Sequence, residues 1–79
     1  MPGKSQKEEK KRQILQASLE VFAQKGYSPT VLDDVAARAN MAKGTLYLYF
    51  KDKEDLYINT VLHFFELLEA QIRDNLRPD

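Results

Sequence analysis

Residues 41–50, MAKGTLYLYF, followed at residues 51–56 by KDKEDL, carry more structural information than any other stretch of this chain. On a helical wheel of about 100° per residue, Leu46 and Phe50 fall on one side, where they can enter a core. Gly44, Tyr47 and Leu48 point the other way, onto a face that a surface helix normally covers with glutamate, lysine or glutamine. The stretch therefore predicts a helix whose inner face is buried and whose outer face is left free for a partner.

A second short helix is predicted immediately before this stretch. It would bury Val35 and Ala36, and Ala36 is small where the two helices must cross. Asn40 is the non-glycine residue best suited to a left-handed turn between the two helices. Thr30 suits an N-cap of the first of them, with Asp33 three residues on as a capping-box partner. Two short helices joined by such a turn are typical of a helix-turn-helix, in which the second helix reads DNA.

The remaining sequence predicts two longer helices and contains no strand pattern. Apolar residues at helical spacing indicate a first helix that Gly26 closes in the left-handed conformation. Asp52 is expected to cap a last helix that continues to about Leu76, before Pro78. The fold class is therefore all-α, a three-helix bundle with a helix-turn-helix plus a long fourth helix. The helices are expected over about residues 10–25, 31–38, 42–50 and 53–76.

Length and charge limit the chain to one small domain with an uneven surface. It has 79 residues and a formal net charge of zero, near the lower limit for a self-sufficient core. Residues 1–13 hold five basic and two acidic side chains, and residues 38–53 hold four basic and one acidic. Residues 54–79 hold two basic and six acidic side chains. This asymmetry indicates a basic working surface with an acidic remainder behind it.

Several protein classes are disfavoured by what the sequence lacks. The chain has no cysteine, which excludes a disulfide framework and a thiolate metal site. Its N-terminal residues lack the apolar region of a signal peptide, and no apolar run approaches the roughly 18 residues that span a bilayer. His63 has no second metal ligand nearby, and no glycine-rich phosphate loop precedes a helix. We expect a cytoplasmic protein without membrane partner, enzymatic activity, cofactor or metal.

Residues 30–56 closely resemble the DNA-binding module of the tetracycline-repressor (TetR) family of transcription regulators, and the resemblance extends over about residues 10–62. Its most specific part is the string KGTLYLYF at residues 43–50, with Lys53 and Leu56 behind it. The resemblance implies binding of double-stranded operator DNA in the major groove. It also implies a C-terminal domain, absent from this chain, that forms a homodimer and binds a small-molecule inducer.

The resulting domain plan has three parts. Residues 1–9 are interpreted as a flexible basic arm, because they are polar and show no periodicity. Residues 10–53 form the helix-turn-helix domain, and residues 54–79 form the helix that leads to the missing domain.

The resemblance also implies which residues contact DNA. Those of the recognition helix fall on Ala42, Lys43, Gly44, Thr45, Tyr47, Leu48 and Tyr49. In the family, the positions of Lys53 and Tyr47 hold phosphates, and those of Thr30, Lys10 and Lys11 flank the DNA backbone. A lysine at a helix start opposes the helix dipole, which favours an external anion as the reason for Lys53. Two positions depart from the family pattern: the turn residue, often glycine, is Asn40, and the residue opening the helix, often serine, is Ala42.

The fourth helix carries more apolar surface than a three-helix core can cover. A helix packed on such a core needs an apolar arc of roughly 100°, whereas this one is apolar over more than half of its circumference. Either the missing domain covers the surplus, or copies of this chain associate through it. Its polar side is expected to be a narrow stripe of Asp55, Asn59, His63, Glu66, Ala70 and Arg73.

These features predict a sequence-specific transcription regulator. The expected form is a repressor that binds a near-palindromic operator as a dimer, associates with the nucleoid and is released by inducer. An activator or a nucleoid-associated regulator on the same fold is the alternative within this class. Outside it, the chain could be a helical protein-interaction module, in which the outer face of the third helix and the apolar fourth helix bind protein.

Overall fold

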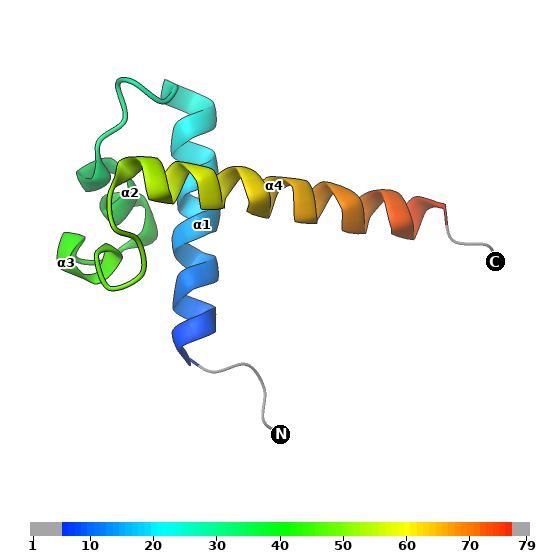
Figure 1. Cartoon of the computed structure of the whole chain (residues 1–79), viewed down its shortest axis with the longest axis horizontal. Helices are drawn as coiled ribbons and strands as arrows, with labels where there is room; N and C mark the ends of the chain where they lie inside the picture. The colour runs from blue at the N-terminus through cyan, green and yellow to red at the C-terminus, as the bar shows by residue number, and fades with distance from the viewer. Residues whose placement is uncertain (1–5, 77–79) are drawn as a thin grey trace.

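Four α-helices make up the described part of the chain, residues 6–76 of the computed structural model. The all-α prediction is confirmed, and no strand occurs within these residues. Figure 1 shows α2 and α3 gathered beside α1, while α4 crosses α1 and its second half extends away from the other three helices. The helices are α1 (Gln6–Lys25), α2 (Leu32–Ala39), α3 (Lys43–Leu46) and α4 (Lys53–Asn75).

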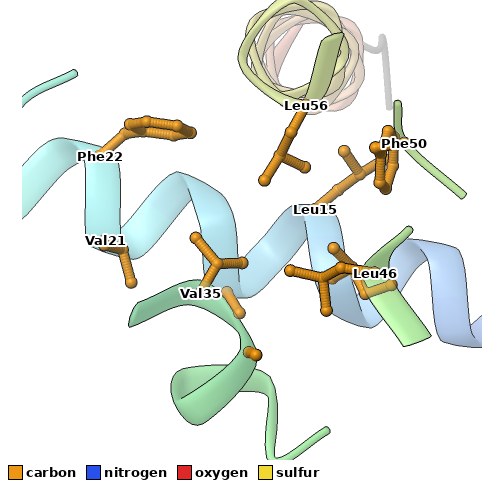
Figure 2. Packing of buried hydrophobic residues seen from close by; sticks show 10 residues of the cluster. Leu15, Val21, Phe22, Val35, Leu46, Phe50 and Leu56 are labelled. Atoms are coloured by element: carbon orange, nitrogen blue, oxygen red, sulfur yellow. The ribbon is translucent and has the colours of Figure 1, made fainter. Parts of the chain in front are cut away.

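The core lies where α2, α3 and the start of α4 meet α1. Leu56 points from α4 toward α1 in Figure 2, and Val35 and Leu46 approach the same helix from α2 and α3. Fully burying one such aliphatic side chain contributes about 1.5–3 kcal/mol. The core residues are Ile14, Leu15, Ala17, Val21, Phe22, Val35, Ala36, Leu46, Phe50 and Leu56.

Three local signals in the sequence are confirmed as helix ends. Gly26 has a φ of 88° and closes α1, and its N–H donates to the Phe22 carbonyl at 2.8 Å. Asn40 adopts the left-handed conformation after α2, with φ 59° and ψ 46°. Asp52 caps α4, where its carboxylate accepts the Asp55 N–H at 2.8 Å. Each end depends on chemistry within a few residues, which is why periodicity and capping rules locate it.

The helix α1 begins earlier than predicted. It starts at Gln6, so the interpretation of a flexible arm is wrong for residues 6–9, and residues 1–5 lie outside the described part of the chain. Glu8 and Glu9 stand in the first turn, where negative charge suits the helix dipole. Arg12 bonds to the Glu9 carboxylate one turn back at 2.6 Å. These local interactions extend the helix beyond its buried apolar face.

The start of α2 also differs from the prediction. The N-cap is Val31, not Thr30, and the helix begins at Leu32. The carboxylate that accepts the free N–H of Val31 belongs to Asp34, at 3.1 Å, rather than to Asp33. The one-residue shift follows from Thr30, whose side chain is drawn into the interior and cannot serve the helix end.

The predicted third helix over residues 42–50 is too long. Only Lys43–Leu46 is α-helical, and the chain continues in tighter turns, with the Leu48 N–H on the Thr45 carbonyl at 3.1 Å. Ala42 is extended and offers no side-chain cap, so the helix starts without support. Glycine, threonine and tyrosine are also weaker helix formers than alanine or leucine. Burial of Leu46 and Phe50 holds the segment in place despite its weak propensity.

Candidate nucleic-acid interface

The segment from Ala42 to Phe50 separates into the two faces that the sequence predicts. Leu46 and Phe50 are only 1% and 4% exposed and anchor the segment in the core. Tyr47 is 50% exposed and Leu48 is 77% exposed, on the side facing away from it. We call the exposed set the outer face of α3. It consists of Ala42, Lys43, Gly44, Tyr47 and Leu48, with Thr45 and Tyr49 half-buried at its edges.

Gly44 is the barest point of the outer face. No neighbouring atom lies within 4 Å of the position that an alanine Cβ would take there. Its backbone does not need a positive φ, so neither packing nor conformation within the chain requires glycine. Glycine costs about 1 kcal/mol relative to alanine inside a helix. Nothing within residues 6–76 therefore explains the glycine, whereas the close approach of a partner would.

Within residues 6–76, Lys43 is held by a single surface ion pair. Its Nζ lies 3.2 Å from an Asp33 carboxylate oxygen on α2, and both side chains are more than half exposed. Exposed pairs of this kind contribute about 0–1 kcal/mol, so the lysine is available to exchange its partner.

Two lysines near the start of α1 are expected to flank the DNA backbone. They lie at different edges of the helix-turn-helix. Lys11 Nζ is 5.9 Å from the centre of the Phe50 ring, which puts its charge beside the end of the α3 segment. Lys10 lines a polar groove between α1 and the α2–α3 turn, together with Arg38 and Asn40. Both therefore stand on the same side of the molecule as the helix-turn-helix.

Thr30 is not at the surface. Its residue is 0% exposed, and its hydroxyl donates to the Gly26 carbonyl at 2.6 Å. The hydroxyl thus satisfies a backbone acceptor at the end of α1. In this conformation the Thr30 side chain is separated from any DNA backbone by the protein itself.

The cation of Lys53 is satisfied inside the chain. Its Nζ donates to the carbonyl oxygens of Tyr27 at 2.9 Å, Ser28 at 3.3 Å and Thr30 at 2.9 Å. It also stands 4.3 Å from the centre of the Tyr27 ring. The cost of a cation at this helix start, which favours an external anion, is thus also offset by partners within the chain. The loop between α1 and α2 supplies the negative ends of three carbonyl dipoles.

Two ion pairs tie α1 to α2 on the surface and shift carboxyl pKa values. The Lys25 ammonium, 2.8 Å from Asp34, lowers the pKa of that carboxyl, and the Val31 N–H lowers it further. Hydrogen bonds from Gln16 and then Arg38 lower the pKa of Glu20. Both pairs are solvent-exposed, so they contribute little to the free energy of packing α2 on α1.

The polar stripe predicted on α4 is partly turned inward at His63. His63 is 9% exposed, and its Nε2 has no hydrogen-bond partner within residues 6–76. Thr60 is buried beside it and shares a hydrogen bond of 2.8 Å with Ser18 of α1. The sequence contained no signal for this pairing, because the two hydroxyls are 42 residues apart and each suits a surface position equally well.

Another part of the α4 surface is apolar and exposed, and we call it the exposed apolar side of α4. Most of its residues lie in the half of α4 that projects beyond α1 (Figure 1). No helix within residues 6–76 is both long and apolar enough to cross a membrane. The exposed apolar residues of this side are Ile58, Leu62, Phe64, Phe65, Leu67, Leu68, Ile72 and Leu76.

Known proteins match this chain over most of its length. Residues 14–60 match the family described as bacterial regulatory proteins, tetR family. The fatty acid metabolism regulator protein of Bacillus subtilis is 40% identical over 73 residues, covering 87% of this chain and 38% of that protein. The transcriptional activator FasR of Mycolicibacterium smegmatis is 34% identical over 71 residues, covering 90% and 32%.

A solved structure agrees with the computed fold. The fatty acid degradation regulator FadR from Bacillus halodurans superposes with a TM-score of 0.70 at 34% identity. The superposition covers 86% of this chain and 38% of FadR. The chain thus spans less than two fifths of the length of each of these proteins.

Proposed function

This chain belongs to the tetR family of bacterial regulatory proteins, which are DNA-binding transcription regulators, and from that premise we propose that it docks the outer face of α3 in the major groove of operator DNA. The observation that carries the proposal is the pairing of a buried anchor, Leu46 and Phe50, with an outer face that no part of residues 6–76 covers. A bare glycine and an exposed leucine have no stabilising role in water at such a place. Close approach of this face to a DNA major groove would give both residues a role.

Base reading is assigned to three side chains of this face. Leu48 would contact a thymine methyl group, Thr45 would add a methyl contact or a hydroxyl hydrogen bond, and Lys43 would donate to guanine O6 and N7. The weak pair between Lys43 and Asp33 supports this assignment, because it costs little to exchange for a base. Ala42, Gly44 and Tyr49 would shape the surface that fits the groove.

Phosphate contacts would supply most of the affinity. We assign them to Tyr47 on the outer face of α3, to Lys11 beside the end of that segment and to Lys10 in the groove between α1 and the α2–α3 turn. Such contacts position the protein without reading sequence, and each lysine–phosphate contact adds to the salt dependence of binding. Thr30 is left out because its side chain is buried.

Duplex binding measured as a function of salt tests the proposal against the protein-interaction alternative. For a DNA-binding domain, the logarithm of the affinity for nonspecific duplex falls linearly with the logarithm of salt concentration. An apolar protein contact responds little. Selection of bound sequences from a random duplex library then yields the half-site, with a thymine expected opposite Leu48 and a guanine near Lys43. Absence of any salt-dependent duplex binding would reject the proposal.

The complete protein is proposed to be a repressor that acts as a homodimer on a near-palindromic operator and is released by a small-molecule inducer. A dimer seated in two successive major grooves can block a promoter without any further contact, which makes repression the simplest outcome. The match to the activator FasR favours activation as the second candidate. Such a regulator works in the cytoplasm at the nucleoid. Placing the selected operator relative to the promoter distinguishes the two modes, since a repressor's site overlaps the promoter.

The exposed apolar side of α4 supports a covering domain in the complete protein. Apolar patches of this kind rarely stay open to water in monomeric proteins. Residues 1–79 alone are therefore expected to self-associate in sedimentation or to bind a hydrophobic dye. A monomer at high concentration that binds no dye would mean that this side of α4 needs no cover.

A further inference from the structure

We propose that Lys53 is a positioning residue that clamps the α1–α2 loop to the start of α4. The inference rests on the proposed DNA-binding function only for its affinity measurement. A lysine ammonium has three N–H donors and no acceptor. Three loop carbonyls accept from Nζ, at 2.9, 3.3 and 2.9 Å. In this conformation each N–H of Lys53 has an acceptor in the loop.

The surroundings of Lys53 match a clamp. Its Nζ stands over the ring of Tyr27, where a cation is attracted to the aromatic face. Tyr27 in turn meets Tyr57 of α4 edge-to-face at 4.8 Å and stacks beside Phe22 of α1 at 5.9 Å between ring centres. The loop is thus held from α4 by charge on its carbonyls and by aromatic contacts on its side chain.

The clamp has a consequence for the helix-turn-helix. The chain passes directly from the clamped carbonyl of Thr30 through Val31 into α2 at Leu32. Because α2 packs on α1 and α3 packs on α2, the position of this entry point affects the angle at which α3 is presented. Through Lys53, α4 is therefore hydrogen-bonded directly to Thr30, just before the two helices of the helix-turn-helix. We infer that operator binding depends on Lys53 through this seating.

Two substitutions distinguish a clamp from a phosphate contact. Lys53→Met keeps most of the side-chain length and removes the charge and all three donors. Lys53→Arg keeps the charge, and a guanidinium binds phosphate at least as well as an ammonium does. However, its N–H groups diverge in a plane, so they match three carbonyls that converge on one nitrogen less well. Lys51→Ala, two residues earlier at an exposed position, is the matched control for loss of a lysine.

The first readout is amide exchange in the loop, which needs no DNA. The Thr30 N–H donates to the Tyr27 carbonyl at 3.2 Å, and Lys53 holds that same carbonyl. With the clamp removed, Thr30 amide exchange is expected to accelerate about tenfold or more in Lys53→Met, less in Lys53→Arg and not in Lys51→Ala. Amides in the middle of α1 serve as the internal reference. If Lys53→Met does not fold, Lys53→Arg carries the test.

The second readout is the salt dependence of duplex binding. A positioning role predicts that Lys53→Arg, which keeps the charge, lowers affinity at every salt concentration and leaves the slope of log affinity against log salt unchanged. Loss of a phosphate contact, by contrast, lowers the magnitude of that slope by about one. Unchanged Thr30 exchange in Lys53→Met, or full parental behaviour of Lys53→Arg in both measurements, would overturn the proposal. A parent that binds no duplex would overturn the proposed function, and the exchange rates would still decide the clamp.

Discussion

The outer face of α3 and the α1–α2 loop region contain similar kinds of side chain, but these are exposed on the outer face and buried or bonded in the loop region. On the outer face, Leu48 is exposed, a Cβ added at Gly44 would meet no neighbouring atom within 4 Å, and Lys43 has one weak surface partner within residues 6–76. In the loop region, Thr30 is buried and Lys53 has an acceptor for each of its donors. Both regions match the family pattern, so sequence resemblance alone assigns both to DNA. The difference shows that a residue at a family DNA-contact position can also have partners inside the chain, and those partners are visible only in the tertiary structure.

The comparison between faces is sharpest for two leucines separated by one residue. Leu46→Ala removes a 1% exposed anchor and is expected to lower the free energy of unfolding by about 2–5 kcal/mol. Leu48→Ala removes an exposed side chain and is expected to change it by less than about 0.5 kcal/mol. Urea unfolding followed by circular dichroism measures both. Equal losses would mean that Leu48 is packed and that the two faces are not distinct.

For base preference we expect the reverse order, with Leu48 the more important leucine. Leu48→Ala is expected to relax the preference at one base pair by about 1 kcal/mol or somewhat more, because a thymine methyl loses its apolar contact. Nonspecific affinity should stay nearly unchanged, since leucine contributes no charge. Selection from a random duplex library measures the preference. Identical base preferences in the variant and the parent would make Leu48 an idle surface residue.

Gly44 tests whether the outer face is kept bare for a partner. Gly44→Ala is expected to leave stability equal or raise it by up to about 1 kcal/mol, because alanine is the better helix former and its Cβ meets no atom of the chain. Specific DNA binding should weaken, since the added methyl stands between helix and groove. Thermal unfolding and duplex titration give the two values. Lower stability in the variant would show that the glycine serves the backbone instead.

The smallest expected effect concerns the surface tie between α1 and α2. The folded state lowers the pKa of Asp34, chiefly through Lys25. The stability that this carboxylate contributes is therefore complete above the ordinary carboxyl range of about pH 4 and is lost as pH falls through the lowered value. The gap in unfolding free energy between the parent and Asp34→Asn should shrink over that fall.

A double-mutant cycle isolates that tie. Lys25→Ala removes the ammonium, so Asp34→Asn should cost less in the Lys25→Ala background than in the parent. The coupling is measured from thermal unfolding at pH 7 and at pH 2–3. Coupling that persists unchanged at the acid pH would assign it to something other than the ionised carboxylate.

The sequence predicted most of the fold because the deciding signals are local. Gly26 and Asn40 occupy left-handed positions for steric reasons that involve only their own backbone, and Asp52 caps the helix that follows it by accepting the N–H of Asp55, three residues on. The inner and outer faces of α3 follow from the spacing of Leu46 and Phe50. The errors lie where local preference is weak or where a distant residue competes. The third helix is shorter than its pattern suggests. The helix α2 starts one residue later than predicted because the Thr30 side chain is buried and does not cap it.

The sequence by itself thus determined the all-α class, the helix-turn-helix and the outer face of α3, since turn sterics, capping and helical periodicity act over a few residues. Only the tertiary structure decided the partners of Lys53, which lie 23 to 26 residues away, and the inward turn of Thr60 and His63 on α4. A long, flexible lysine or a small hydroxyl suits solvent, phosphate or a buried acceptor equally well. Which of these it meets depends on how distant segments pack, because packing alone brings those acceptors within reach.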